Sequence, residues 1–385
     1  MINGMKFQLL LASLFSQIKG RHWWLGVLLW IALCLPAEAS VILRVAIERD
    51  AKQVKVGSST AAVVKDSSGR TLGQLPAMNA YYAQAVPGGV ALDKWRSGLF
   101  WIEPSGKGGF VYIGDRWYRG RTLVVPTDKG VTAVNWVDLE EYLYSVLGGE
   151  MNSRWPLEAL KAQAIAARTY ALYERSRQRN NPIYDLGASP DRWQIYKGVI
   201  SESRPTYAAV DGTAGQVLTY KNQLILSVFH ACSGGHTENV EDVWLSKEPY
   251  LRAVPDFDQN IRECYWMRTF SPTEISSKFP EIGNAKQMII EQRSPFNSVK
   301  TLKIVGDKGE KVLRGEEVRT ALKLKSTRFN VSNGNGGFTL QGLGFGHAIG
   351  MSQWGAYNLA LQGANHLQIL GYYYKGVALT PIKVK

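Results

Sequence analysis

The chain has 385 residues, of which 45% are hydrophobic and 20% charged, and its formal net charge is +13. These proportions are typical of a folded protein and exclude a largely disordered one, and the length is enough for one large domain or two ordinary ones. The positive charge favours contact with an anionic wall polymer or membrane surface. No helix-turn-helix, zinc-finger or RNA-binding signature supports nucleic acid as the partner.

Residues 1–39 have the pattern of a secretory signal peptide. A basic patch from Lys19 to His22 precedes the apolar run WWLGVLLWIALCLP, and an A-x-A cleavage pattern ends at Ala39. The run is short for a membrane-spanning helix. We therefore expect cleavage after Ala39 and export to the periplasm, cell wall or exterior, and membrane contact only if the segment stays uncleaved. Cleavage lowers the formal charge to +11 because it removes Lys6, Lys19, Arg21 and Glu38.

The segment from residue 40 to about 137 predicts β-strands and hairpins. Its short alternating runs are broken by Gly, Ser, Pro and Asp, as in VILRVAIE, GGFVYIGDRWYRG and VTAVNWV. The stretch at residues 87–109 is irregular and predicts a long loop. We expect residues 40–117 to form a β-rich N-terminal region and residues 118–385 the main domain.

Two helices are predicted next. Asp138, with Glu141 three residues later, has the pattern of a capping box at the start of the first helix, and Gly148-Gly149 is expected to end it. The second helix is expected to have Pro156 at its first position and to run to about Arg175, with a face of small residues for close packing.

The rest of the chain mixes short strands and helices. Strands are predicted at GQVLTY and LILSVFHA, joined by a turn at Lys221-Asn222, and again at TLKIVGDKG and KVLRGEEV. PTEISSKFP predicts a helix, and GLGFGHAIGMSQWGAYNLALQG predicts a glycine-rich loop that enters a helix. The mixture predicts an α+β fold: an antiparallel β-rich core with a helical segment and a glycine-rich strand-to-helix loop lining a groove.

Glu150 lies between the two predicted helices, after two glycines. The residues alone favour a solvated turn glutamate. The alternative is a carboxyl held near Met151 and Trp155, where desolvation raises its pKa as a general acid at neutral pH requires.

A second group of residues suits a metal or a disulfide. His230, Cys232 and His236 lie within seven residues, and Cys264 follows. Two His and two Cys suit tetrahedral zinc, but the spacing matches no standard finger. A Cys232–Cys264 disulfide, natural in an exported protein, and two buried thiols are the alternatives that remain open.

A third group surrounds His347 in GLGFGHAIGMSQWGA. This loop lacks the ending of a phosphate-binding loop, so nucleotide binding is not expected. Either it is a structural turn, or it forms the floor of a polar groove. A cysteine nucleophile, with Cys232 beside His230 or His236, is a weaker reading because two residues along one strand give poor geometry for attack, and the chain has no G-x-S-x-G elbow.

Four blocks together resemble the sporulation stage II protein D family, to which the amidase enhancer LytB also belongs. They occur in the family's order and span most of residues 118–377. The blocks are VDLEEYLYSVLGGEMNSRWPLEALKAQAIAARTYAL; DRWQIYKG; VFHACSGGHTENVEDVW with PYLRAV; and GFGHAIGMSQWGAYNLALQG with ILGYYYKGV.

The resemblance implies an exported protein that acts on bacterial peptidoglycan. The sporulation protein is a lytic transglycosylase, which cleaves the MurNAc–GlcNAc bond and leaves a 1,6-anhydro product. LytB-like members enhance an N-acetylmuramoyl-L-alanine amidase, so a non-catalytic enhancer is the alternative function, and a cell-wall amidase is an expected partner beside the glycan strands. The family's catalytic glutamate in its E-M-P motif corresponds to Glu150, although Asn152 stands here in place of the proline.

The same resemblance directs the other site assignments. We expect Lys161, Gln163 and Arg168 to orient sugar or support the site, with Arg168 equally suited to a structural ion pair. His347, Ser352 and Gln353 are expected on the opposite wall of the groove. Some family members carry zinc near the S-G-G motif, and a zinc ion here, held by His230, Cys232, His236 and Cys264, would have a structural role.

Overall fold

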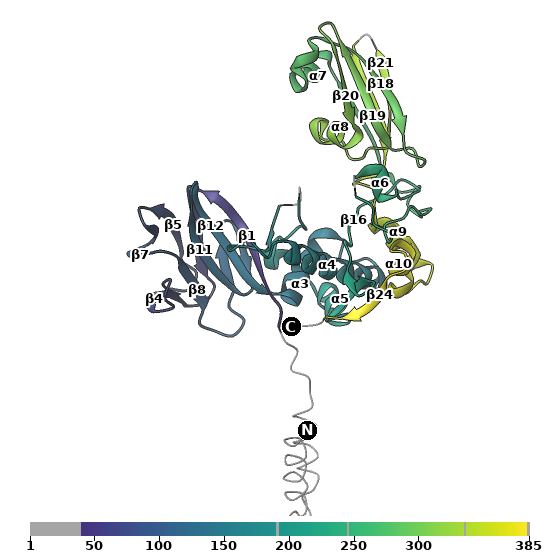
Figure 1. Ribbon diagram of the computed structural model, residues 1–385. Helices are drawn as coiled ribbons and strands as arrows, with labels where there is room; N and C mark the ends of the chain where they lie inside the picture. The colour runs from purple at the N-terminus through teal and green to yellow at the C-terminus, as the bar shows by residue number, and fades with distance from the viewer. Residues whose placement is uncertain (1–39, 190–191, 245, 335, 383–385) are drawn as a thin grey trace, which may run out of the picture. The chain divides into compact units, whose positions relative to one another are not determined.

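The computed structural model describes residues 40–189, 192–244, 246–334 and 336–382 (Figure 1). One compact unit spans Ile42–Lys383. The predicted signal peptide at residues 1–39 lies outside the described residues. In the part of the chain that is described, no helix has the length and apolar character needed to cross a membrane.

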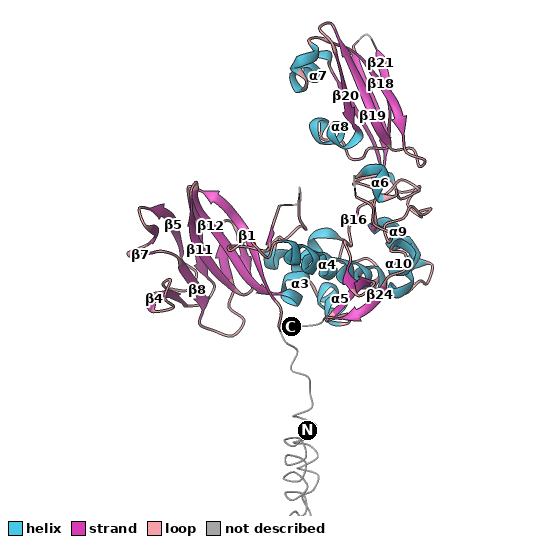
Figure 2. Ribbon diagram, viewed as in Figure 1, coloured by secondary structure: helices cyan, strands magenta, loops and turns pink. Residues whose placement is uncertain are grey.

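Two sheets, antiparallel except for one parallel pair of strands at the edge of the larger sheet, form most of the N-terminal part of this unit, and Figure 2 shows their strands. Val64 and Ile102 lie opposite each other on neighbouring strands, and both are fully buried. Side chains alternate between the two faces of a sheet, so opposite residues of this kind point to the same, inner face. The seven-stranded sheet runs in the order β13 (Leu186–Gly187), β1 (Ile42–Ala51), β12 (Gly130–Asp138), β11 (Arg121–Thr127), β8 (Phe100–Pro104), β3 (Ala62–Lys65) and β4 (Thr71–Leu75). The six-stranded sheet runs β10 (Arg116–Tyr118), β9 (Val111–Ile113), β2 (Gln53–Ser58), β5 (Ala80–Val86), β6 (Gly89–Leu92) and β7 (Trp95–Ser97).

A helical segment follows, centred on α4 (Leu157–Arg177). Its alanines are buried because α3 (Leu139–Glu150), α5 (Arg204–Asp211), α9 (Gln353–Leu361) and α10 (His366–Tyr373) all contact it, as does β14 (Gln216–Tyr220). Small side chains allow so many elements to approach one helix. The other short elements of this part of the chain are η1 (Gly198–Ser201), β15 (Gln223–Leu224), β16 (Phe229–His230), α6 (Val240–Val243), β23 (Met351–Ser352) and β24 (Ala378–Pro381).

Residues 265 to 343 form two three-stranded sheets with an apolar core of their own. The first sheet contains β17 (Tyr265–Phe270), β22 (Gly337–Leu343) and β21 (Phe329–Gly334), and the second contains β18 (Ala285–Arg293), β19 (Val299–Gly306) and β20 (Glu310–Arg314). The helices are α7 (Pro272–Lys278) and α8 (Gly315–Leu322), with short turns at η2 (Arg262–Cys264) and η3 (Pro280–Ile282). The chain leaves β22 directly into the glycine-rich loop.

The predicted α+β class is confirmed, and so are the strands at GQVLTY, the pair β19–β20 and the helix at PTEISSKFP. Lys221 and Asn222 have φ of 48° and 62°, as expected for the tight turn. The long loop expected at residues 87–109 is wrong, because β6, β7 and β8 occupy most of it. The single strand expected at LILSVFHA is wrong, because Leu224 ends β15 and Phe229–His230 forms β16, which belongs to a different sheet. The division at residue 117 stays a prediction, and strands from both sides of it pair in the seven-stranded sheet.

Candidate active site

Glu150 is the last residue of α3, and its carboxylate is held by two distant segments. The backbone N–H of Ile195 donates to Oε1 at 2.7 Å. The side chain of Gln353, at the start of α9, also donates to it, and the Lys197 ammonium acts on it electrostatically. Gln353, expected on the opposite wall of a groove, thus contacts Glu150 directly, and its role in substrate binding stays a prediction.

Burial raises the pKa of Glu150 to about 7, even though the Ile195 hydrogen bond, the Lys197 charge and the Gln353 hydrogen bond each lower it. Desolvation therefore outweighs three contacts that favour the carboxylate. No carboxylate is among the described groups that shift this pKa. A lone carboxyl with a pKa close to neutral is able both to donate and to accept a proton at physiological pH.

The two glycines before Glu150 lie inside α3 instead of ending it. A Cβ at Gly148 would meet the Ser201 carbonyl oxygen at 1.9 Å, and one at Gly149 would meet the Ile195 carbonyl oxygen at 2.7 Å. The expectation that they end the helix is wrong. They let the 195–201 segment lie against the last turn of α3, which brings the Ile195 N–H within reach of Glu150.

Arg168 and Lys161 have protein partners. Arg168 is fully buried, and its guanidinium donates to both carboxylate oxygens of Glu140, at 2.6 and 2.8 Å, and to the backbone carbonyls of Gln216 and Val210. This corrects the expectation of a sugar contact and supports the structural ion pair. Lys161 pairs with Glu158 at 2.9 Å on α4.

Gln163 is fully buried in α4, and neither atom of its amide has a hydrogen-bond partner among the described residues. It shares a helical face with Ala167 and Tyr170. That face meets the segment before Ile195: Gln194 donates to the Ala167 carbonyl at 3.3 Å, and the Tyr170 hydroxyl donates to the Arg192 carbonyl at 3.1 Å. The substrate role of Gln163 stays a prediction.

The Ser352 hydroxyl caps α9 and contacts Asp258. It is fully buried, accepts the Gly355 N–H at 3.1 Å as the N-cap, and donates to the Asp258 carboxylate at 3.0 Å. Its hydroxyl is used inside the protein, which corrects the expected substrate contact. His347 contacts the rings of Trp244 and His230, at centroid distances of 5.0 and 5.4 Å, and burial lowers its pKa well below the usual value.

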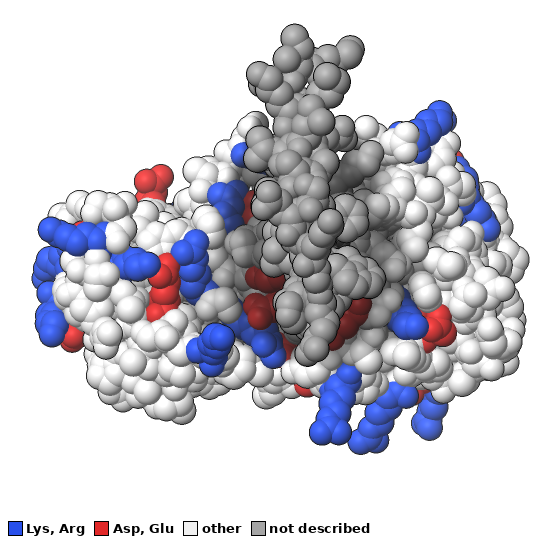
Figure 3. Space-filling view, turned by 90° about the horizontal axis from the view of Figure 1, so that it is seen from below, with Lys and Arg blue, Asp and Glu red and all other residues white. Residues whose placement is uncertain are grey.

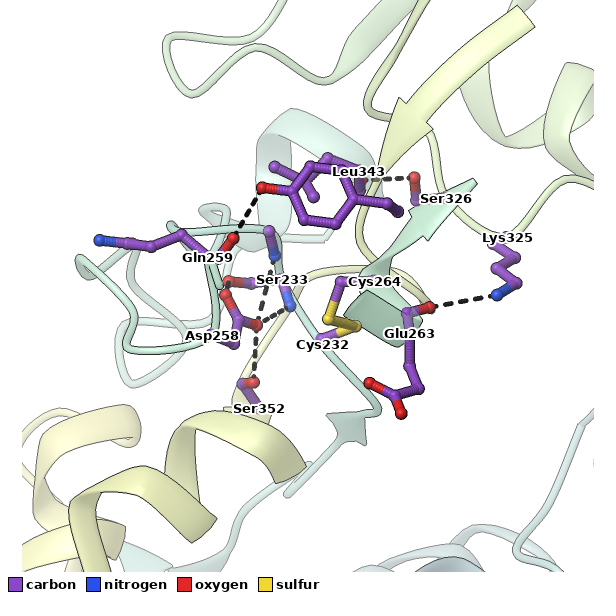
Figure 4. The surroundings of a disulfide bond; sticks show 12 residues. Cys232, Ser233, Asp258, Gln259, Glu263, Cys264, Lys325, Ser326, Leu343 and Ser352 are labelled. Atoms are coloured by element: carbon purple, nitrogen blue, oxygen red, sulfur yellow. Dashed lines mark hydrogen bonds between the residues drawn. A yellow bond between two sulfur atoms is a disulfide. The ribbon is translucent and has the colours of Figure 1, made fainter. Parts of the chain in front are cut away.

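Cys232 and Cys264 form a disulfide (Figure 4). Of the alternatives open from the sequence, this is the one in the structure. His230 is buried with its Nδ1 3.1 Å from the Ile349 carbonyl, and His236 stacks on Phe296 with its Nδ1 2.8 Å from the Thr237 carbonyl.

The four predicted zinc ligands do not fit a metal ion in this form, because bonded sulfurs are not thiolates. Within the described ranges, the metal-suited side chains whose ligand atoms gather are Cys232, Asp258 and Cys264, with neither histidine among them. Zinc binding by the reduced chain stays a prediction.

Asp258, which the sequence did not single out, is the buried anchor of the S-G-G loop. Its carboxylate accepts the backbone N–H groups of Ser233, Gly234 and Gly235 as well as the Ser352 hydroxyl (Figure 4). It thereby ties this loop to the start of α9, next to Gln353. Three backbone donors on one carboxylate hold the glycines in place.

The backbone around the disulfide also holds the glycine-rich loop. Cys232 and Phe345 exchange two backbone hydrogen bonds, at 3.1 and 2.7 Å, and the Gly344 N–H donates to the Cys264 carbonyl at 2.8 Å. The disulfide therefore joins the two segments that position the loop leading to Gln353.

On one face of the molecule, charged side chains are spread over several places. On the face shown in Figure 3, Lys and Arg side chains stand at several separate places with Asp and Glu among them. Where described residues are visible on this face, they form no continuous basic stripe of the kind that follows a nucleic-acid backbone.

Comparisons with known proteins place two matches on the chain. A family model described as "Stage II sporulation protein" matches residues 127–220, which include Glu150 and Ile195. A model of a domain of unknown function matches residues 266–350, which nearly coincide with the two three-stranded sheets.

Relatives extend the likeness along the chain. It is 36% identical to stage II sporulation protein D of Bacillus amyloliquefaciens, over 64% of this chain and 76% of that protein. It is 33% identical to the protein of that name in Bacillus subtilis, over 64% and 76%. The amidase enhancer of Bacillus subtilis is 29% identical over 62% of this chain but only 40% of its own length.

Proposed function

Because this chain belongs to the stage II sporulation protein D family, we propose that it is an exported lytic transglycosylase of peptidoglycan, with Glu150 as the general acid and base. The observation that carries the proposal is the single carboxyl with a pKa of about 7, held by Ile195 and Gln353. Glycosidases that use water rely on two carboxyl groups flanking the bond. No second carboxylate is among the described groups that shift the pKa of Glu150.

The proposed reaction needs one proton carrier. Protonated Glu150 donates to the oxygen that links MurNAc to GlcNAc, and the bond from this oxygen to C1 of MurNAc breaks. The C6 hydroxyl oxygen of MurNAc then bonds to C1, and its proton passes to the Glu150 carboxylate. The products are a 1,6-anhydro MurNAc end and a free GlcNAc hydroxyl; no water is consumed, and Glu150 is protonated again.

Neighbouring groups suit both states of Glu150. Burial favours the protonated carboxyl that starts the reaction. The Ile195 N–H, the Gln353 amide and the Lys197 charge stabilise the carboxylate that forms after proton donation. The surroundings of Glu150 therefore suit a carboxyl that first donates a proton and then accepts one.

The test is release of anhydro-MurNAc products from peptide-stripped glycan strands by the purified chain. We expect release by the wild type and a loss of at least about 100-fold in Glu150→Gln, the order expected for a lost general acid–base group. Glu141→Gln, which removes another α3 carboxylate, is the control and should retain activity.

A non-catalytic enhancer is the second candidate, supported by the match to the amidase enhancer. It predicts no release by wild type or variant, together with stimulation of an added amidase. A zinc hydrolase would instead give ordinary reducing ends and lose activity with a chelator.

A further inference from the structure

Three aromatic side chains form a cluster on the two segments that follow Glu150 and Gln353. The ring centroids of Trp155 and Trp354 are 4.5 Å apart, and Tyr357 lies 5.0 Å from the first and 5.3 Å from the second. Trp155 follows Glu150 by five residues, and Trp354 follows Gln353, whose side chain donates to Glu150. The cluster thus joins the two segments that carry the candidate catalytic contacts.

The cluster has the exposure of a binding surface. All three side chains are only half-buried, whereas the core tryptophans Trp193 and Trp266 are buried. Among the described residues, the indole N–H groups of Trp155 and Trp354 have no protein acceptor and are not buried, so both reach solvent. Each ring therefore packs one part of its surface on its neighbours and presents a polar edge outward.

This combination suits a sugar ring. A pyranose has an apolar face of C–H groups and a rim of hydroxyls, and an amphipathic aromatic ring with an outward N–H matches both. A flat apolar surface beside a carboxyl of near-neutral pKa also limits where a glycan strand lies relative to the proton donor.

We propose that Trp155, Trp354 and Tyr357 form a stacking subsite for a pyranose unit next to the bond that is cleaved. This inference rests on the proposed function, because it takes the ligand of the Glu150 site to be a glycan strand. These three residues, the aromatic subsite, have no role among those expected from the sequence motifs.

The test uses Glu150→Gln as the background so that glycan binds without being cleaved. Binding of peptide-stripped glycan strands to the full chain is measured by titration calorimetry. We expect Trp155→Leu and Trp354→Leu to weaken binding by about tenfold or more, the equivalent of about 1.4 kcal/mol. Trp155→Phe keeps a ring and should recover most of the affinity.

Trp101→Leu is the matched control. Trp101 is also half-buried and packs at 4.8 Å on another tryptophan, Trp136, but it lies in the seven-stranded sheet. This variant should bind within about twofold of the background. Thermal unfolding of every variant identifies those that fold, and only folded variants are compared. With Glu150 intact, we expect Trp155→Leu to raise KM more than it lowers kcat.

Two results would overturn the subsite, and they differ in what they say of Glu150. If the background binds glycan and folded Trp155→Leu and Trp354→Leu bind it equally well, the aromatic cluster only packs the fold and the proposed function stands. If the wild type releases no anhydro product and the background binds no glycan, the proposed function fails together with the subsite.

Discussion

At the scale of single residues, the environment of Glu150 decides what it is able to do. The same carboxyl in a solvated turn would be ionised at neutral pH and useless as an acid. Burial against the 195–201 segment reverses this, and the pKa of about 7 follows from desolvation. Glu158 shows the opposite case: burial is the largest single effect and raises its pKa, but the contacts with Lys161 and His366 together outweigh burial and lower the pKa to about 2.

The raised pKa predicts how activity and stability depend on pH. Because the protonated carboxyl donates first, kcat/KM should fall as pH rises above about 7. The folded state holds the proton more tightly than the unfolded state, whose pKa is 4.5, so the contribution to stability is full below pH 4.5 and is lost as pH rises through about 7. Glu150→Gln stays neutral, and its free energy of unfolding should gain on that of the wild type between pH 5 and pH 8.

Glu158→Gln provides the control of opposite sign. Its carboxylate is stabilised in the folded state, so removing the charge should lower stability near neutral pH. Chemical denaturation at several pH values measures both variants. An advantage of Glu150→Gln that does not change with pH would contradict the raised pKa.

At the scale of elements, the last turn of α3 positions the site by close approach. Local patterns were enough to predict this helix and α4, since capping and periodicity act over a few residues. The contacts that define the site are not local: Ile195 lies 45 residues from Glu150, and Gln353 is on the other side of an inserted pair of sheets. Family resemblance, not periodicity, pointed to Glu150 and Gln353.

The roles of Arg168, Gly148 and Gly149 could not be predicted from the sequence, because each depends on contacts with distant residues. The sequence left Arg168 equally suited to a sugar contact and to a structural ion pair, because an ion pair between helices leaves no spacing signal; the 2.6 Å contact with Glu140 identifies the ion pair. Gly148 and Gly149 were predicted to end the helix because glycine is common at helix C-termini. Their actual role, making room for the backbone oxygens of Ile195 and Ser201, depends on residues 46 and 53 positions further along the chain.

This packing gives a prediction at Gly149. Alanine there places a methyl group 2.7 Å from the Ile195 carbonyl oxygen, which requires the segment that donates to Glu150 to shift. We expect Gly149→Ala to lower stability by about 1–3 kcal/mol and to lower kcat. Unfolding in denaturant and the anhydro-product assay measure the two effects.

Gly371→Ala is the matched control. Gly371 also lies in a helix, α10, but a Cβ there meets nothing within 4 Å. This variant should be more stable by about 0.5–1 kcal/mol, because alanine is the better helix former, and fully active. If Gly149→Ala behaved in the same way, close approach at α3 would not be what positions Ile195.

At the scale of the whole molecule, segments far apart in sequence meet around one small region. The S-G-G loop, the turn before β17 and the glycine-rich loop are joined by the Cys232–Cys264 disulfide and by Asp258 (Figure 4). Gln353 begins the helix that this region supports. The chain enters and leaves the two sheets at residues 265–343 beside the disulfide. The positions of the loops there therefore depend on a crosslink of a kind that forms in oxidising compartments.

The disulfide therefore predicts how the chain responds to reduction. The cysteines are 32 residues apart, and opening a loop of this length gives the unfolded chain entropy worth about 3–4 kcal/mol. We expect reductant to lower the free energy of unfolding by about this amount and to reduce anhydro-product release, because the loop leading to Gln353 loses its anchor. The Cys232→Ser/Cys264→Ser double variant should show the lower stability without reductant and no response to it.

Mass spectrometry of peptides and elemental analysis complete this test. Under non-reducing conditions, the peptides that contain Cys232 and Cys264 should be recovered linked, and the chain should contain no stoichiometric zinc, because the sulfurs are already bonded to each other. Separate peptides together with one zinc ion per chain would contradict the disulfide and support thiolate ligands instead. In that case a chelator, and not a reductant, should release the loops that position Gln353.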